Sequence, residues 1–274
     1  MTADHSVLNP LEGEIFVVDK PLGWSSFHVV KKLRGALTAR LRKAGVRKLK
    51  VGHAGTLDPL ATGVMILCTG KATKRIDELQ AGVKEYIAEI RLGATTPSFD
   101  LETPVDAVFP TEHITRESAE DALKRFIGKI EQVPPSYSAC KVDGHRAYKM
   151  ARNGEEVELK PKPLVIDEIE MLDFSPGQIV VRVVCSKGTY IRALARDIGQ
   201  ALKSGAHLTG LRRTRVGDAL IENSLSITDA IRIIHETPMT MPGDDGNPVE
   251  VAATEFSPDV MGNEKADIKP FDQR

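Results

Sequence analysis

Hydrophobic residues alternate with polar ones, or run together, in several short stretches that predict β-strands. The stretch KEYIAEIRLG (84–93) alternates with a period of two, which is the periodicity of a strand. The stretch VMILC (64–68) is apolar throughout, which is typical of a buried strand. Further strands are expected at residues 15–21, 164–174 and 178–188, and within 208–219.

Apolar residues spaced three and four apart predict the helices. Val29, Val30, Leu33 and Leu37 recur on one face of a helix expected from about residue 27 to 41, and the serines at 25–26 offer N-caps for it. Further helices are expected at residues 71–80, 114–128, 145–152 and 190–202. In the helix at 114–128, Thr115 can cap, but Ser118 stands where a capping box has an acid.

The order of these elements indicates the fold class and the domain boundaries. Strands alternate with helices, and two strands alternate in polarity, which favours an α/β protein with a mixed sheet over an all-parallel one. We expect one domain at residues 12–236, interrupted by a surface excursion at 131–162. Residues 237–274 contain five prolines and few aromatic residues, so we expect a disordered acidic tail.

The composition is that of an ordinary soluble protein, with 41% hydrophobic and 27% charged residues. No apolar run is long enough to cross a membrane, and the N-terminus has no signal-peptide core, so we expect a cytoplasmic protein. The three cysteines fit neither a disulfide framework nor a zinc site. Cys68 and Cys185 lie inside apolar runs and are expected to be buried thiols.

The net charge of −1 conceals a strong asymmetry along the chain. Residues 20–57 contain ten Lys and Arg and no Asp or Glu, whereas residues 236–274 contain nine acids and three bases. A basic surface of this kind suggests a polyanionic partner such as nucleic acid. The alternative is a helix face that is merely solvated.

One carboxylate stands alone in the small-residue stretch KVGHAGTLDPLATGVMILCTGKATKR (50–75). Pro59 biases Asp58 toward an extended conformation, so its carboxylate is expected to project from a loop. The stretch matches neither a dinucleotide-binding fingerprint nor a phosphate loop. Asp58 can therefore face a ligand held against the loop, or it can cap a following helical turn.

Six stretches in this order carry a resemblance to a known family: VDKPLGWSSF (18–27), GHAGTLDPLATGV (52–64), KEYIAEIRLGATT (84–96), QVPPSYSACKVDGHRAY (132–148), CSKGTYIRALARDIG (185–199) and GAHLTGLRRTRVG (205–217). Over roughly residues 12–235 the chain resembles the TruB family of tRNA pseudouridine synthases. The resemblance implies a pseudouridine synthase fold, with a mixed, mainly antiparallel central sheet and flanking helices. It further implies the T stem-loop of tRNA as partner, with uridine 55 as the target. This isomerisation needs no metal and no organic cofactor, and nothing in the sequence demands more than a monomer.

The resemblance also implies roles for individual residues. Asp58 matches the catalytic aspartate, Arg192 the arginine that pairs with it, and Tyr86 the tyrosine that stacks on the target base. Tyr190 and Leu211 match residues that line the uracil pocket. His53 matches a histidine that helps to hold displaced loop nucleotides. The excursion matches an RNA-clamping segment, and the side chains expected on the RNA backbone are Lys20, Lys141, Arg146, Lys149 and Arg152.

Three departures from the family pattern affect these expectations. The stretch ATTPSFDLETP (94–104) replaces the usual sequence, so no role is assigned around Asp100. Residues 38–46 look like a small basic insertion. Because few residues follow position 236, we expect the RNA-binding PUA domain of many bacterial members to be missing.

A single acid suits the chemistry of this family. Pseudouridine formation breaks the N1–C1′ bond and joins C5 to C1′, so one carboxylate can serve at the sugar or the base. A glycosidase needs two acids because it delivers water. Two alternatives stay open: an RNA-binding protein or tRNA-folding chaperone on the same fold, and a nucleobase glycosylase.

Overall fold

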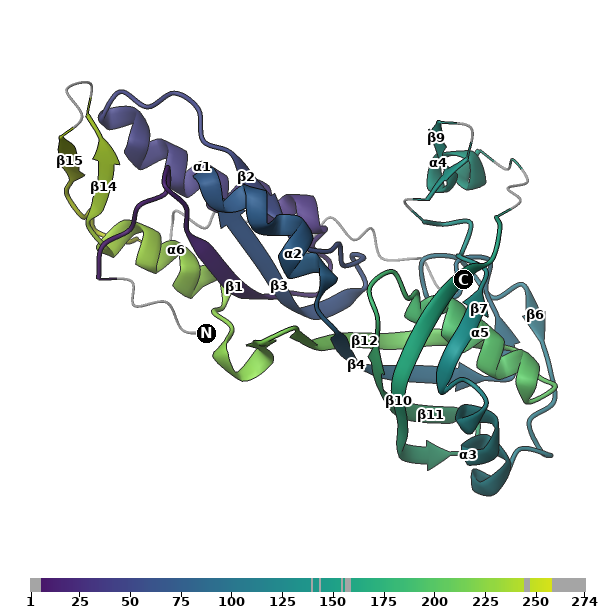
Figure 1. Cartoon of the computed structure of the whole chain (residues 1–274). Helices are drawn as coiled ribbons and strands as arrows, with labels where there is room; N and C mark the ends of the chain where they lie inside the picture. The colour runs from purple at the N-terminus through teal and green to yellow at the C-terminus, as the bar shows by residue number, and fades with distance from the viewer. Residues whose placement is uncertain are drawn as a thin grey trace. The chain divides into compact units, whose positions relative to one another are not determined.

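The computed structural model describes residues 6–138, 140–142, 144–153, 155, 159–243 and 247–257. The chain divides into two compact units, which are described separately. Unit 1 comprises residues 1–82 and 213–274, and unit 2 comprises residues 83–212 (Figure 1). Among the described residues, no helix is both long and apolar enough to cross a membrane.

The sheet of unit 1 is built around β3 (Ala61–Thr69). Its antiparallel neighbour β1 (Ile15–Lys20) pairs Ile15 with Cys68 and Lys20 with Gly63. The short strand β2 (Val51–His53) pairs with the end of β3. The last residues of β12 (Ala206–Val216) also lie beside β3 and continue through a turn into β13 (Ala219–Leu220).

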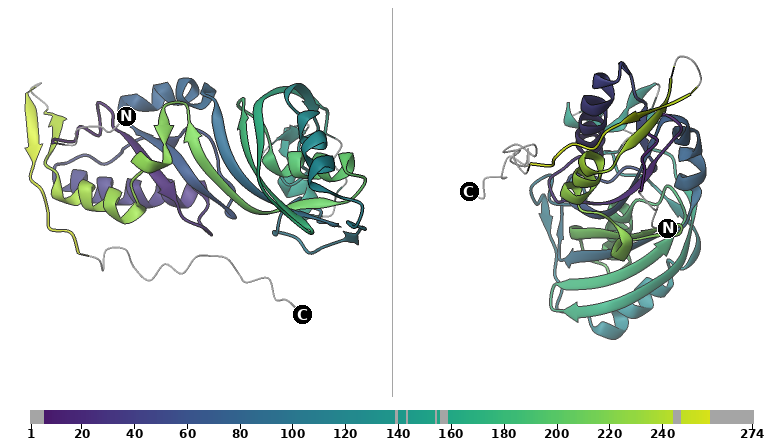
Figure 2. Two further views of the ribbon diagram at one scale, coloured as in Figure 1. Left: turned by 90° about the horizontal axis from the view of Figure 1, so that it is seen from below. Right: turned by 90° about the vertical axis from the view of Figure 1, so that its left-hand side faces the viewer.

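Alternation along β3 gives this sheet two different faces. Met65 and Leu67 face the larger core, which is covered by α1 (Ser26–Lys43) and α6 (Ile227–Glu236). Val64, Ile66 and Cys68 face a smaller core, which is covered by η1 (Gly70–Arg75) and α2 (Ile76–Ala81). Figure 2 shows α2 and α6 on opposite sides of the sheet.

Part of the segment after α6 is folded, and the expectation of disorder is wrong for residues 239–242 and 248–251. It forms an antiparallel hairpin of β14 (Met239–Pro242) and β15 (Pro248–Val251). Met239 is fully buried against the larger core of unit 1. Two of the prolines occupy the end of the hairpin, where Pro242 pairs with Pro248, so they do not interrupt its strands. Residues 258–274 of the predicted tail lie outside the described residues.

Arg40 of α1 fastens this segment to unit 1. Its buried guanidinium donates to the carbonyls of Thr237 at 2.6 Å, Val251 at 3.1 Å and Ala252 at 2.5 Å, and also to that of Ile234. One of the ten cations counted in the basic stretch is therefore a structural group, because it is committed to main-chain carbonyls inside the fold.

The sheet of unit 2 contains, in spatial order, β12, β4 (Lys84–Leu92), β11 (Gln178–Cys185), β10 (Lys162–Ser175) and β7 (Gly128–Gln132). The pairs β4–β11, β11–β10 and β10–β7 are antiparallel. The helices α3 (Arg116–Lys124) and α5 (Ile191–Ala201) flank this sheet (Figure 1). The predicted class, a mixed α/β protein with a mainly antiparallel sheet, is confirmed.

The remaining elements are short. They are β5 (Ala94–Thr95), β6 (Ala107–Val108), β8 (Lys141–Val142), β9 (His145–Arg146), α4 (Ala147–Arg152) and η2 (Ile221–Asn223). The helix expected from residue 145 thus begins at Ala147, after a small hairpin. At α3 the capping box is complete, because the Ser118 hydroxyl accepts from the Thr115 amide at 2.9 Å in place of an acid.

Candidate active site

Asp58 lies in the loop that joins β2 to β3 in unit 1. The side chain is half-buried, and the Asp58 carbonyl accepts a hydrogen bond from the Ala61 amide at 3.1 Å. Gly55 has a φ of 96°, a conformation that favours glycine. A strand follows this turn, so Asp58 does not cap a helix.

Arg213 of β12 holds the loop from one side. Its guanidinium, 1% exposed, donates to the carbonyls of Val64 at 2.8 Å, Gly55 at 3.2 Å and Thr56 at 3.4 Å. A planar guanidinium with five donors holds these carbonyls in one fixed geometry. Gly63 leaves room for this approach, because a Cβ there would lie 2.1 Å from the carbonyl oxygen of Arg213.

Lys20 at the end of β1 holds the loop from a second side. Its fully buried ammonium donates to the carbonyls of Trp24 at 2.6 Å, Pro21 at 3.0 Å and Pro59 at 3.4 Å. Burial lowers the pKa of Lys20 from 10.5 to about 8, although the nearby Asp58 carboxylate acts in the opposite direction. The structure therefore places Lys20 inside unit 1 and not at the surface position expected for a contact to RNA backbone.

Ser26 and His53 complete the surroundings of the loop. The Ser26 hydroxyl contacts both main-chain polar groups of Leu57, the residue before Asp58. His53 is half-buried in β2, and burial lowers the pKa of its ring, so the imidazole is neutral at pH 7. Among the described residues, its buried Nδ1 has no hydrogen-bond partner.

Arg192 lies in the first turn of α5 in unit 2 and is 5% exposed. It donates to the carbonyls of Ser98 at 3.0 Å and Tyr137 at 2.9 Å, and its Nε lies 3.6 Å from Asp100 Oδ2. The stretch around Asp100, to which sequence reasoning assigned no role, thus positions Arg192. The Ser-x-Asp spacing could have indicated a turn here, because Asp100 Oδ1 accepts a hydrogen bond from the Ser98 hydroxyl at 2.6 Å.

Tyr190, the residue before α5, is held by its neighbours in unit 2. The Gln132 side-chain amide bonds both main-chain groups of Tyr190, at 2.9 and 3.2 Å. The phenol oxygen lies 3.4 Å from Cys140 Sγ, which is 3.7 Å from Lys162 Nζ. Burial raises the pKa of Tyr190 to about 12, so the phenol is protonated at neutral pH and can donate.

The three thiols have different environments. Burial raises the pKa of Cys68 and of Cys185 to about 11. Burial acts in the same direction on Cys140, but hydrogen bonds with Tyr190 and Ser138 and the charge of Lys162 outweigh it and lower the pKa of that thiol. Among the described residues, no three His, Cys, Asp or Glu side chains are grouped so as to hold a metal ion.

The other predicted residues are distributed as follows. Tyr86 lies on β4, opposite Val183, and is 8% exposed; Leu211 is half-buried on β12. Lys149 is exposed on α4. Three residues belong to β8, β9 and α4, but their side chains lie outside the described part: Lys141, Arg146 and Arg152. Asp58 and Arg192 belong to different units, so their pairing stays a prediction.

Comparisons with known proteins identify the chain. Residues 42–191 match the model for the TruB family pseudouridylate synthase (N terminal domain), and residues 192–236 match that for the tRNA pseudouridylate synthase B C-terminal domain. A tRNA pseudouridine synthase B from Phocaeicola vulgatus is 68% identical over 220 residues, which cover 80% of this chain and 92% of that one. The enzyme of the same name from Flavobacterium johnsoniae is 52% identical, with 80% and 94% covered.

Two solved structures contain chains with a similar fold. A Cbf5-Nop10-Gar1 complex contains a chain that is 26% identical, with a TM-score of 0.60 over 86% of this chain. A chain of the archaeal box H/ACA sRNP Nop10-Cbf5 complex is 25% identical, with a TM-score of 0.58 over 83%. The present chain spans 60% and 55% of the length of these two chains, respectively. The family models and the relatives therefore define a pseudouridine synthase. Within that class, the chain belongs to the TruB family, as its sequence motifs predict.

Proposed function

We propose that this enzyme converts uridine 55 in the T-arm loop of tRNA to pseudouridine, with Asp58 as its single catalytic aspartate. The observation that carries the proposal is the loop itself. Arg213, Ser26 and Lys20 fix the main chain on both sides of Asp58, which presents one carboxylate in a defined orientation. The relatives named tRNA pseudouridine synthase B support tRNA as the substrate.

The chemistry fits a single fixed carboxylate. The N1–C1′ bond of the uridine breaks, the uracil turns, and C5 joins C1′ while the C5 proton is lost and N1 gains one. Atoms and electrons balance without an oxidant or a cofactor. The carboxylate can act at C1′, at the base or on a sugar proton. A target base inside a folded loop has to be flipped out, and stacking on an aromatic ring, about 1–3 kcal/mol per base, offsets part of that cost.

The residues of unit 2 take supporting roles in this proposal. Arg192 pairs with the Asp58 carboxylate and orients it. Tyr86 stacks on the target uracil, while Tyr190 and Leu211 line its pocket. His53, from unit 1, holds displaced loop nucleotides. The enzyme acts as a monomer in the cytoplasm, and the side chains at 141, 146, 149 and 152 contact RNA phosphates.

Release of tritium from C5-labelled uridine in an unmodified tRNA transcript tests the proposal. The wild type should release one tritium per tRNA, and a transcript with cytidine at position 55 should release none. Asp58→Asn should release none from either transcript while binding tRNA as the wild type does. Failure of the wild type to release tritium, with binding retained, would favour a tRNA-folding protein. Loss of binding in Asp58→Asn would make the aspartate a structural residue.

A further inference from the structure

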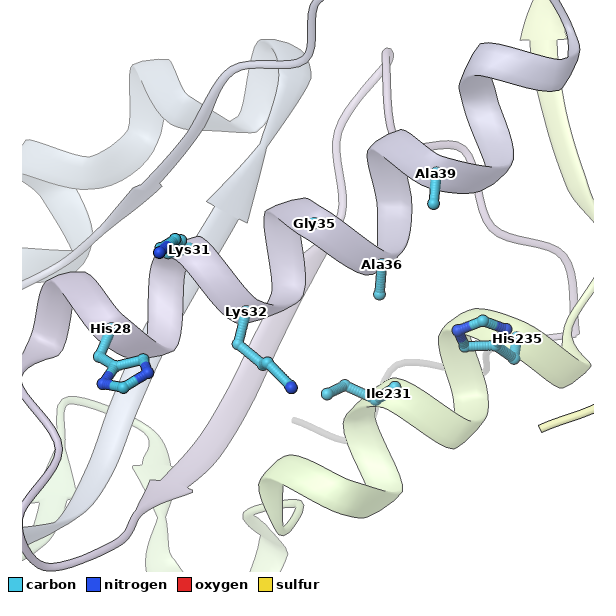
Figure 3. Close-up of a pocket in the computed structure, with 8 residues that line it drawn as sticks. All are labelled: His28, Lys31, Lys32, Gly35, Ala36, Ala39, Ile231 and His235. Atoms are coloured by element: carbon cyan, nitrogen blue, oxygen red, sulfur yellow. The ribbon is translucent and has the colours of Figure 1, made fainter. Parts of the chain in front are cut away.

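A groove between α1 and α6 carries positive charge and has no part in the site described above. Both helices belong to unit 1, and the groove has a volume of about 270 Å³ (Figure 3). The residues that line it are His28, Lys31, Lys32, Gly35, Ala36, Ala39, Ile231 and His235.

The shape of the groove follows from residue spacing on α1. His28, Lys32, Ala36 and Ala39 recur at three- and four-residue intervals and so lie along one side of the helix. Figure 3 shows the Lys32 side chain pointing into the space between α1 and α6. Small residues form the middle of the groove, and beside Gly35 there is open space where a side chain would be. A bulky chain can therefore approach α1 closely.

The charge of the groove comes from lysine. The 18 residues of α1 include no acid, and Lys31 is exposed while Lys32 is half-buried. Arg34 and Arg42, on the same helix, are also exposed. Burial lowers the pKa of His235, so that ring adds no charge at neutral pH. A positively charged surface of this kind attracts an anionic chain.

The groove begins close to Asp58. Ser26 is the first residue of α1, and its hydroxyl is bonded to Leu57, the neighbour of Asp58. His28 follows two residues later. From His28 to Ala39 the helix rises about 16 Å, at about 1.5 Å per residue. The His28 end of the groove is therefore the end nearest to the Asp58 loop.

We propose that the α1–α6 groove binds the phosphate backbone of the same RNA whose uridine reaches Asp58, outside the reacting nucleotide. This inference rests on the proposed function for the identity of the RNA. Contacts to phosphates fix position and register without reading sequence, and they make affinity depend on salt. The groove therefore contributes to affinity for tRNA and not to the chemical step.

The test compares two double variants in which the same charge is removed. Lys31→Ala/Lys32→Ala removes the lysines of the groove. Lys71→Ala/Lys74→Ala removes two exposed lysines from η1, on the opposite side of the unit 1 sheet. Alanine is the residue most favourable to a helix, so α1 should fold in the first variant. Ala39→Glu places an acid at an exposed position of the groove and provides an independent variant.

Binding of an unmodified tRNA transcript is measured at several salt concentrations, with every variant also carrying Asp58→Asn so that no turnover occurs. The slope of log Kd against log salt should fall by about 2 in the groove variant, because each lysine removed leaves one phosphate without its cation, and it should stay unchanged in the η1 variant. Ala39→Glu should weaken binding. Tritium release at saturating enzyme should be unchanged in the groove variant that retains Asp58.

Equal slopes in the groove variant and the wild type would overturn the proposal, and so would equal reductions of the slope in the groove and η1 variants. Because binding is read without turnover, this result does not depend on whether uridine 55 is the target. Failure of the proposed function appears only in tritium release from the wild type. The two failures are therefore distinguishable.

Discussion

The hydroxyl of Ser26 satisfies both main-chain polar groups of Leu57. It accepts from the Leu57 amide at 2.8 Å and donates to the Leu57 carbonyl at 2.9 Å. Both residues are buried, at 3% and 4% exposure. The first turn of α1 is thereby joined to the residue that precedes Asp58, so the position of the carboxylate depends on the helix.

Ser26→Ala should reduce turnover more than it reduces tRNA affinity. The substitution leaves two buried main-chain groups of Leu57 without a partner, at a cost of about 1–3 kcal/mol each. Ser25→Ala is the matched control, because Ser25 caps α1 through the His28 amide, and among the described residues its hydroxyl has no hydrogen bond to the loop. It should cost only about 1 kcal/mol of stability. Thermal unfolding and single-turnover tritium release measure both effects; equal rates in the two variants would contradict the role assigned to Ser26.

Turnover should fall above about pH 8 because Lys20 loses its proton there. The pKa of this lysine is lowered to about 8 by burial, and a neutral amine has only two hydrogens for its three carbonyl acceptors. The Pro59 contact, at 3.4 Å the longest, should weaken first. Lys20→Met should show low activity without a break near pH 8, whereas the surface variant Lys71→Met should retain the break.

The loss of the Lys20 proton should increase the stability of the fold, although it should lower turnover. The folded pKa lies below the ordinary 10.5, so between pH 8 and 10.5 the unfolded chain binds more protons than the folded one. The contribution of Lys20 to the free energy of unfolding therefore rises with pH across this window. Urea unfolding at pH 7.5 and pH 10, in wild type and Lys20→Met, isolates this contribution; a larger rise in the variant would be inconsistent with it.

Arg192→Lys should impair turnover strongly. The guanidinium reaches Ser98, Tyr137 and Asp100 in three directions, and an ammonium cannot reproduce that geometry. Each charge-assisted bond that is removed is worth about 1.5–3 kcal/mol, or about ten- to a hundredfold in rate if it is expressed fully in turnover. Single-turnover rates give the result, and near-normal activity would exclude a positioning role for the arginine fork.

Asp100→Asn provides the companion measurement. The amide can still accept from the Ser98 hydroxyl, so the turn should persist, but the charge beside Arg192 is removed. We expect a smaller reduction of turnover than in Arg192→Lys. If Asp100→Asn and the wild type had the same rate, the contact at 3.6 Å would contribute nothing to the site.

Truncation tests what the β14–β15 hairpin contributes to stability. Ending the chain at residue 257 keeps every described contact, so the thermal midpoint should stay unchanged. Ending it at residue 238 removes buried Met239 and the Val251 and Ala252 carbonyls that accept from Arg40. A buried donor without a partner costs about 1–3 kcal/mol, so the midpoint should fall clearly. Equal midpoints for the two truncated chains would show that the hairpin adds no stability.

Local patterns predicted much of this fold. The period-two alternation of residues 84–92 corresponds to β4, and the spacing of Val29, Val30, Leu33 and Leu37 corresponds to the buried face of α1. The loop position of Asp58 follows from the proline after it. In each case the information lies within a few residues of the element that it predicts.

The parts that were not predicted depend on partners far away in sequence. Arg40 is buried because carbonyls about 200 residues later accept its hydrogen bonds. Lys20 continues the inward alternation of Phe16 and Val18, a signal that was present but that its charge obscured. Asp100 gains its role only where the chain returns with Arg192: the local Ser-x-Asp spacing indicates the turn but not that distant partner.

The unequal environments of the three thiols make the chain suitable for selective labelling. Cys68 and Cys185 are buried with raised pKa values, while Cys140 is half-exposed with a lowered one. A maleimide dye at neutral pH should therefore attach at one position without any mutation. Because that sulfur lies 3.4 Å from the Tyr190 hydroxyl, the fluorescence of the dye would report changes around the tyrosine as RNA binds.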